Sequence, residues 1–213
     1  MPKRFTPDLS LFLDIVQKLE AIGIPYVIIG GFAATIYGIN RATFDIDIIV
    51  DLVEEHILAL SDAYPLPRFY ADPHQMRNAV QIGSSFNIID VERGEKADLF
   101  PLTMDVRYRP AFENRVRQVI QLLGSETFPI WAARPEDVIF GKLMAWAELH
   151  TKRHESDIYE MMVFHYLGAQ PDIEPAFDEK YVDNLAKQLG EEVAALWQAT
   201  KVAAQQEAKR SRQ

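Results

Sequence analysis

Residues 44 to 50 place apolar side chains at every second position, with Asp45 and Asp47 between the first three of them. Successive side chains of an extended strand point to opposite faces, so the two aspartates share one face and the alternating apolar residues share the other. Two carboxylates this close repel each other unless solvent or a cation compensates. On its own such a pair predicts only a strand with a solvated face, so its meaning depends on its neighbours.

The composition excludes several classes of protein. The chain has 213 residues with a formal net charge of −9. This charge excludes a protein that binds nucleic acid with a surface that is basic throughout, but it allows a local basic patch. It has no cysteine, which excludes disulfide scaffolds, thiol catalysis and cysteine-based zinc sites and fits a cytoplasmic protein. Residues 21–40 carry no charge, but glycine and proline interrupt them. We therefore expect strand, turn and helix there, and no membrane partner.

The hydrophobic pattern predicts an α+β fold. A first domain, residues 1–133, is expected to be a mixed β-sheet flanked by helices, and a second, residues 134–213, an all-helical subdomain. The change comes at Pro135-Glu136-Asp137, where a proline and two acids suit the first turn of a helix. Strands are expected near residues 24–29, 44–50, 68–71, 86–91, 96–102, 116–122 and 127–131.

Three features near the acidic pair point to chemistry. Gly30 and Gly31 end a buried strand and open a helix, where backbone N–H groups can approach a phosphate closely. Arg41 and Thr43 lie four and two positions before Asp45, so an extended backbone would place their side chains on the same side as the two aspartates. Asp98 lies on a later strand, which would place it beside the pair if the two strands are neighbours. Three gathered carboxylates favour hard divalent cations such as Mg²⁺ or Mn²⁺.

Taken together, the motifs are similar to those of a known family. Residues 28–34, Gly38 and residues 41–47 resemble the signature of the DNA polymerase β-type nucleotidyltransferase superfamily, and most closely its AbiEii-like bacterial group, many of which are toxins of toxin–antitoxin pairs. Residues 86–89 and 96–100 resemble the strand pair that supplies that group's third carboxylate. Residues 134–137 with Lys142 resemble its helical motif, and Asp157 with Glu160 its later acidic pair, where the family more often has two aspartates.

The resemblance implies an enzyme that transfers a nucleoside monophosphate from an NTP and releases pyrophosphate, with two Mg²⁺ ions or Mn²⁺ in their place. It implies metal ligation and catalysis by Asp45, Asp47 and Asp98. It also implies a nucleotide site formed by Gly30, Gly31, Arg41, Thr43, Lys142 and Asp157. Three hypotheses about the function stay open. The chain is an enzyme whose acceptor is an RNA end or a protein hydroxyl, or an enzyme whose acceptor is a small molecule such as an aminoglycoside or lincosamide. In the third hypothesis, the chain is a non-catalytic relative that binds nucleotide or a partner such as an antitoxin.

Two cationic features have both a structural and a functional interpretation. Lys142 has apolar residues three and four positions away on both sides along its helix, so it needs a partner or must extend its ammonium to solvent, and Asp157 on the next helix is a candidate partner. The alternative, implied by the resemblance, is a cation that faces the triphosphate. A cluster of four arginines is either a phosphate-binding patch or a solvated face: Arg107, Arg109, Arg115 and Arg117.

Overall fold

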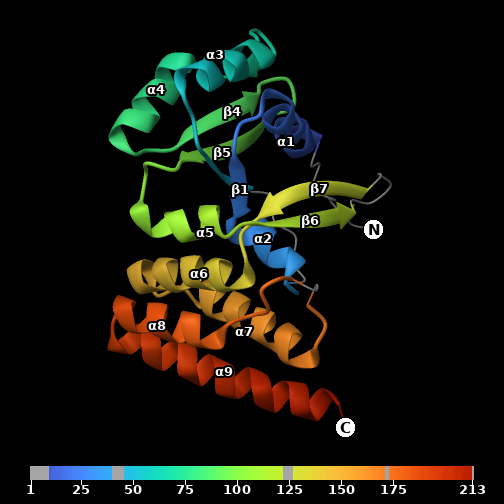
Figure 1. Cartoon of the computed structure of the whole chain (residues 1–213), viewed down its shortest axis with the longest axis vertical. Helices are drawn as coiled ribbons and strands as arrows, with labels where there is room; N and C mark the ends of the chain where they lie inside the picture. Colours follow the sequence, from blue (N-terminus) through green and yellow to red (C-terminus); the bar gives the residue numbers. More distant parts are fainter. Residues whose placement is uncertain (1–9, 40–45, 122–126, 171–172, 213) are drawn as a thin grey trace. The chain divides into compact units, whose positions relative to one another are not determined.

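The computed structural model describes residues 10–39, 46–121, 127–170 and 173–212 (Figure 1). The chain forms two compact units. Unit 1 consists of Met1–Phe32 and Ala42–Ala132, and unit 2 consists of Ala33–Arg41 and Ala133–Gln213. The expected domains, 1–133 and 134–213, stay a prediction. They differ from the compact units in where residues 33–41 are placed.

In the described part of unit 1, seven strands form one mixed sheet in the order β3-β4-β5-β2-β1-β7-β6. Strand β2 runs parallel to β5, and β1 runs parallel to β7, while the other neighbours are antiparallel. The strands are β1 (Tyr26–Ile29), β2 (Asp47–Val50), β3 (Phe69–Tyr70), β4 (Phe86–Asp90), β5 (Glu95–Pro101), β6 (Val116–Gln121) and β7 (Thr127–Ala132). The predicted α+β class with a mixed sheet is confirmed.

Helices flank this sheet, as the sequence predicts. Helix α1 (Ser10–Ile22) contacts β5 and α3 (Glu54–Ala63), and α4 (Pro73–Ile82) contacts β4, β5 and α3. The short helix α5 (Arg109–Glu113) contacts β1. Helix α1 forms because its apolar residues recur at helical spacing and are buried together: Leu11, Phe12, Ile15, Val16 and Leu19.

The sequence also predicts one helix over about residues 104–114, and this prediction is wrong in detail. The structure has a 3₁₀ turn, η1 (Val106–Tyr108), followed by α5. The Asp105 carboxylate accepts a hydrogen bond from the backbone N–H of Arg107, and Pro110 occupies the first turn of α5. Both residues favour a new helical start, which divides the segment into two short pieces.

Unit 2 is all-helical in its described residues. Its long helices are α6 (Pro135–Leu149), α7 (Lys152–Leu167), α8 (Glu179–Leu189) and α9 (Glu191–Ser211), and each of them contacts at least two of the others. The short helix α2 (Gly30–Ile36) begins in unit 1 and ends in unit 2. The segment after α2 is held in unit 2 by the Tyr37 hydroxyl, which donates to the Ala133 carbonyl oxygen at 2.8 Å. No described helix is both long and apolar enough to cross a bilayer.

The two faces of the sheet differ in burial. Along β4 and β5, every second residue is buried, as at Phe86, Ile88, Ala97 and Leu99. The residues between them on β4, and Lys96, Asp98 and Phe100 on β5, are less buried. The sequence alternation there, with Ala97 and Leu99 at one parity and Lys96, Asp98 and Phe100 at the other, predicts one apolar and one polar face. The burial along β5 confirms this prediction, and the polar face carries the candidate site.

Candidate active site

A row of polar side chains crosses three neighbouring strands of the sheet. Asp47, the first residue of β2, is the direct Cα partner of Asp98 on β5, and Asp98 is in turn the partner of Asn87 on β4. Residues paired in this way project from the same face of a sheet. On β1, the residue in line with this polar row is the apolar Ile29, which is the partner of Asp47 and directly precedes Gly30. The sheet topology thus brings Asp47 and Asp98 side by side, although they are far apart in the sequence.

Two donors hold the Asp98 carboxylate. The side-chain amide of Asn87 donates a hydrogen bond to Asp98 Oδ1. The ammonium of Lys96 lies 3.1 Å from both carboxylate oxygens of Asp98. The side chain of Asp98 is 24% exposed and that of Lys96 is 55% exposed, so this contact is open to solvent. Lys96 and Asp98 are two residues apart on one strand, which puts both on the same face.

Gly30 lies directly against the Asp47 carboxylate. Its φ of +68° is in the left-handed region, where a side chain is strained. A Cβ built on Gly30 would also overlap Asp47 Oδ2. The left-handed backbone therefore favours glycine here, and the absence of a side chain leaves the Asp47 carboxylate room in its present position. Gly31, the other glycine of the predicted phosphate turn, is the second residue of α2.

The remaining predicted residues of this site, Arg41, Thr43 and Asp45, lie outside the described residues. Among the residues that the structure does describe, no group of three acidic or histidine side chains is arranged to hold a metal ion. The donor set still fits a hard divalent cation, because Asp47 and Asp98 supply carboxylate oxygens and the Lys96 ammonium already occupies a cation position at Asp98. Metal ligation and catalysis by these residues stay predictions.

Lys142 and Asp157, both in unit 2, form the predicted contact between α6 and α7. The Lys142 ammonium lies 2.6 Å from Asp157 Oδ2, and the side chains are only 6% and 3% exposed. A buried pair of this kind links the two helices and is costly to break from one side. The geometry is that of the structural interpretation, while the role of either residue at a nucleotide stays a prediction.

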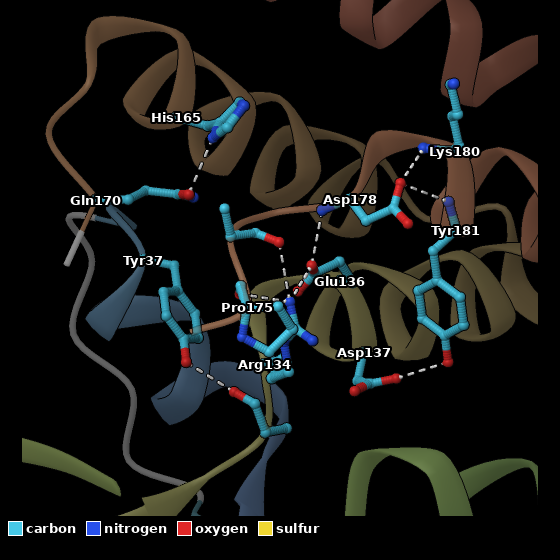
Figure 2. A network of polar contacts seen from close by, with 12 residues as sticks. Tyr37, Arg134, Glu136, Asp137, His165, Gln170, Pro175, Asp178, Lys180 and Tyr181 are labelled. Carbon is cyan, nitrogen blue, oxygen red and sulfur yellow. Dashed lines mark hydrogen bonds and ion pairs between the residues drawn. The ribbon is translucent and has the colours of Figure 1, made fainter. Parts of the chain in front are cut away.

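A second polar network in unit 2, which the sequence did not predict, surrounds the start of α6 (Figure 2). Glu136 Oε1 accepts hydrogen bonds from Arg134 Nη2 at 2.7 Å and from the backbone N–H of Asp178 at 2.8 Å. Arg134 Nη2 also donates to the carbonyl oxygens of Pro175 and Ala176. These contacts fix the loop before α8, and the Asp178 carboxylate then caps that helix through two backbone N–H groups.

Asp137 is the electrostatically unusual member of this network. Its carboxylate accepts a hydrogen bond from the Tyr181 hydroxyl at 3.3 Å (Figure 2). Burial, together with the negative charge of Glu136, raises the pKa of Asp137 to about 6, although Tyr181 and Arg134 act in the opposite direction. In the sequence, residues 136 and 137 suit a helix start and belong to the motif that resembles the family, but nothing there predicts their burial, because tertiary burial leaves no local signal.

The arginine cluster is engaged within the protein. The guanidinium of Arg107 contacts Asp105 at 2.7 Å, and that of Arg109 lies 3.6 Å from Glu113. Arg115 donates to the Phe112 carbonyl oxygen, and Arg117 contacts Glu20 at 2.5 Å. Arg115 and Arg117 both lie over the Trp131 ring. Every member thus has a partner in its own unit, which fits the structural interpretation of this cluster, while phosphate binding by it stays a prediction.

A groove of about 520 Å³ lies between α7 and α9 in unit 2, with Ser156, Tyr159 and Thr200 among its lining residues. None of the described residues that the sequence assigned to the nucleotide or the metal lines this groove. The presence of this groove therefore does not support the predicted nucleotide site or the predicted metal site.

Comparisons with known proteins leave the family open. No family model matches the chain, and no curated protein matches it. Among solved structures, the solution structure of the antibiotic-resistance factor ANT(2'')-Ia is similar, with 14% sequence identity and a TM-score of 0.40, over 96% of this chain and 91% of that one. A likeness at that identity and TM-score says nothing about the chemistry of the site.

Proposed function

We propose that this chain is a divalent-cation-dependent nucleotidyltransferase that moves a nucleoside monophosphate from an NTP to an acceptor hydroxyl. The acceptor oxygen forms a bond to the α-phosphorus, the bond from that phosphorus to the β-phosphate oxygen breaks, and pyrophosphate leaves. A cytoplasmic location is part of this proposal, because NTPs are made and used there. The observation that carries the proposal is the register of β2 and β5, which places Asp47 directly beside Asp98 on the polar face of the sheet.

Each residue of the row has a role that its contacts support. Asp47 and Asp98, with Asp45 as the third predicted ligand, would hold the Mg²⁺ ions, which supply charge neutralisation of the triphosphate and a more acidic acceptor hydroxyl. Asp98 also takes the proton of that hydroxyl. Asn87 fixes the orientation of Asp98 through its amide. Gly30 leaves room for the Asp47 carboxylate, and with Gly31 it brings backbone N–H groups toward the phosphates.

The rate gain in this proposal comes from positioning and electrostatics. Fixed carboxylates and backbone donors need little reorganisation during the reaction, which lowers its barrier. Arg41 is proposed to balance the charge of the triphosphate and Thr43 to position it, in line with the family resemblance. The same resemblance implies a nucleotide-binding role for Lys142, whose ammonium is paired with Asp157 in the structure.

The acceptor is proposed to be an RNA end or a protein hydroxyl, and the chain could then act as the toxin of a toxin–antitoxin pair. A small cationic acceptor, such as an aminoglycoside, is the second candidate. The net charge of −9 favours a cationic small molecule, or a protein, over RNA as the acceptor, because negative charge attracts cations and repels RNA.

The test is an incubation of the protein with each radiolabelled NTP, Mg²⁺, and either total cell RNA, cell lysate or a panel of aminoglycosides and lincosamides. Label in RNA or protein supports the first acceptor class, and label only in the added antibiotics supports the second. Asp47→Asn and Asp98→Asn should lower transfer by about 10²–10³-fold while circular dichroism stays unchanged. Arg77→Gln, which opens an exposed ion pair with Glu54, is the matched control and should keep full activity.

Nucleotide binding without transfer to any acceptor would indicate a non-catalytic relative. Full transfer by both Asp→Asn variants would contradict the role of the carboxylates.

A further inference from the structure

The ammonium of Lys96 occupies the position where a cation at Asp98 would bind. Its Nζ atom is 3.1 Å from Oδ1 and 3.1 Å from Oδ2, so it faces both oxygens of the carboxylate at once. A hard divalent cation binds carboxylate oxygens from the same directions. The ammonium and a divalent cation cannot share this carboxylate closely, because two positive charges at such short range repel each other strongly.

The other partner of Asp98 creates no such conflict. The Asn87 amide donates a neutral hydrogen bond to Oδ1, and Asn87 and Asp98 are direct partners across β4 and β5. A carboxylate oxygen has a second lone pair, so it can keep this donor and also bind a cation. Asn87 therefore orients Asp98 in either state, whereas Lys96 has to leave.

The Lys96 side chain is suited to leaving. It is 55% exposed and sits on a flexible four-carbon stem, so its ammonium can move into solvent at little cost. Exposed ion pairs are also weak, which makes the contact easy to exchange. A buried lysine such as Lys142, whose side chain is 6% exposed, could not be displaced in the same way.

We infer that Lys96 is the resident counter-ion of the cation site and that a divalent cation binds Asp98 by displacing it. This inference rests on the cation site of the proposed function and adds a regulator to it. In the cation-free protein, Lys96 neutralises Asp98 beside Asp47 and limits the repulsion between the two carboxylates. When the cation binds, Lys96 is released, so the apparent affinity of the site is lower than its intrinsic affinity by the strength of the Lys96–Asp98 pair.

The experiment measures Mn²⁺ affinity by isothermal titration calorimetry, without nucleotide, on the full chain and its variants. Lys96→Gln should bind Mn²⁺ about three- to tenfold more tightly than the wild type, because no ammonium has to be displaced. Lys96→Arg keeps a cation there and should stay within about twofold of the wild type. Arg77→Gln removes the same charge from another ion pair of unit 1 and should also stay unchanged, which controls for the loss of one positive charge.

A second readout follows Lys96 itself. The Cε resonance of Lys96, assigned by its loss in Lys96→Arg, should shift when Mg²⁺ is added to the wild type. It should not shift in Asp98→Asn, and the tighter binding of Lys96→Gln should also vanish when Asp98→Asn is added.

Three results would overturn the inference. Equal Mn²⁺ affinity in Lys96→Gln and the wild type would mean that no displacement occurs, with the cation site itself intact. Weaker binding in Lys96→Gln would mean that Lys96 assists the cation. No Mn²⁺ binding that depends on Asp98 would remove the cation site from the proposed function as well. Absence of nucleotidyl transfer together with tighter binding by Lys96→Gln would refute only the proposed function.

Discussion

Gly30 and Asp47 are packed so closely that glycine is required at position 30 for the Asp47 carboxylate to hold its place. Ile29 on β1 is the register partner of Asp47 on β2, so the chain turns into α2 directly beside the carboxylate. Since Asp47 is in turn the partner of Asp98, this contact connects the glycine turn to the acidic row.

Gly30→Ala should destabilise the protein and also disturb Asp47. The left-handed backbone alone costs about 1–3 kcal/mol, and the added methyl group additionally forces the carboxylate to move. Gly94→Ala is a matched control, because Gly94 has nearly the same φ of +67° but open space where its Cβ would be. Urea unfolding should show a loss in both variants and a larger one in Gly30→Ala, and only Gly30→Ala should weaken Mn²⁺ binding. Equal behaviour of the two variants would mean that the contact with Asp47 has no consequence.

Asn87→Ala should weaken the site without unfolding it. Removing the amide that orients Asp98 leaves that carboxylate free to rotate, and loss of such an outer partner typically lowers metal affinity by about 10–100-fold. The measurement is a Mn²⁺ titration by calorimetry beside a thermal melt. A melt shifted by several degrees with unchanged Mn²⁺ affinity would make Asn87 a purely structural residue.

Lys142→Met should cost unit 2 about 3–5 kcal/mol of unfolding free energy, because it leaves Asp157 buried without its cation. The double variant Lys142→Met with Asp157→Leu removes both charges and should recover most of that loss. Urea unfolding at pH 7 measures both. If the single variant loses less than about 1 kcal/mol, the pair is not a significant link between α6 and α7.

Asp137→Asn should stabilise the protein at neutral pH and have little effect in acid. The pKa of Asp137 is raised to about 6 in the folded protein, from 3.8 as its ordinary value. The folded state therefore binds the proton more tightly than the unfolded state. The proton bound to Asp137 therefore stabilises the folded protein fully below about pH 4, and this stabilisation is lost as the pH rises through 6.

Asparagine keeps the oxygen that accepts from Tyr181 but carries no charge. The gain of Asp137→Asn should therefore grow from near zero at pH 4 to about 2–3 kcal/mol at pH 8. Urea unfolding across this pH range measures the gain. A difference that stays constant with pH, or a variant less stable than the wild type at pH 8, would contradict the burial of an ionised Asp137.

The sequence predicts the elements well because their signals are local. The apolar spacing in α1 and the polar alternation of β5 each arise within one segment, and both are found in the structure. The predicted helix over residues 104–114 failed because Asp105 and Pro110 act as new helix starts inside an apolar pattern. Local capping chemistry there outweighs periodicity.

The candidate site was only partly predictable. Parity placed Lys96 and Asp98 on one face, but only the strand order shows that β2 lies beside β5 in a register that pairs Asp47 with Asp98. The donation from Asn87 depends on the antiparallel pairing of β4 and β5. The burial of Glu136 and Asp137 depends on the chain around residues 175–181, some forty residues later. Such contacts arise from topology and leave no periodic trace in the sequence.

The central claim is that Asp47 and Asp98 together bind a divalent cation, and a crystal structure with Mn²⁺ and a non-hydrolysable NTP analogue tests it most directly. The account predicts an anomalous difference peak about 2–2.5 Å from carboxylate oxygens of both residues, with the Lys96 ammonium withdrawn from Asp98. It also predicts that this peak is absent in Asp98→Asn crystals. An analogue bound with no ion at these carboxylates, or Mn²⁺ bound elsewhere while Lys96 still contacts Asp98, would contradict it.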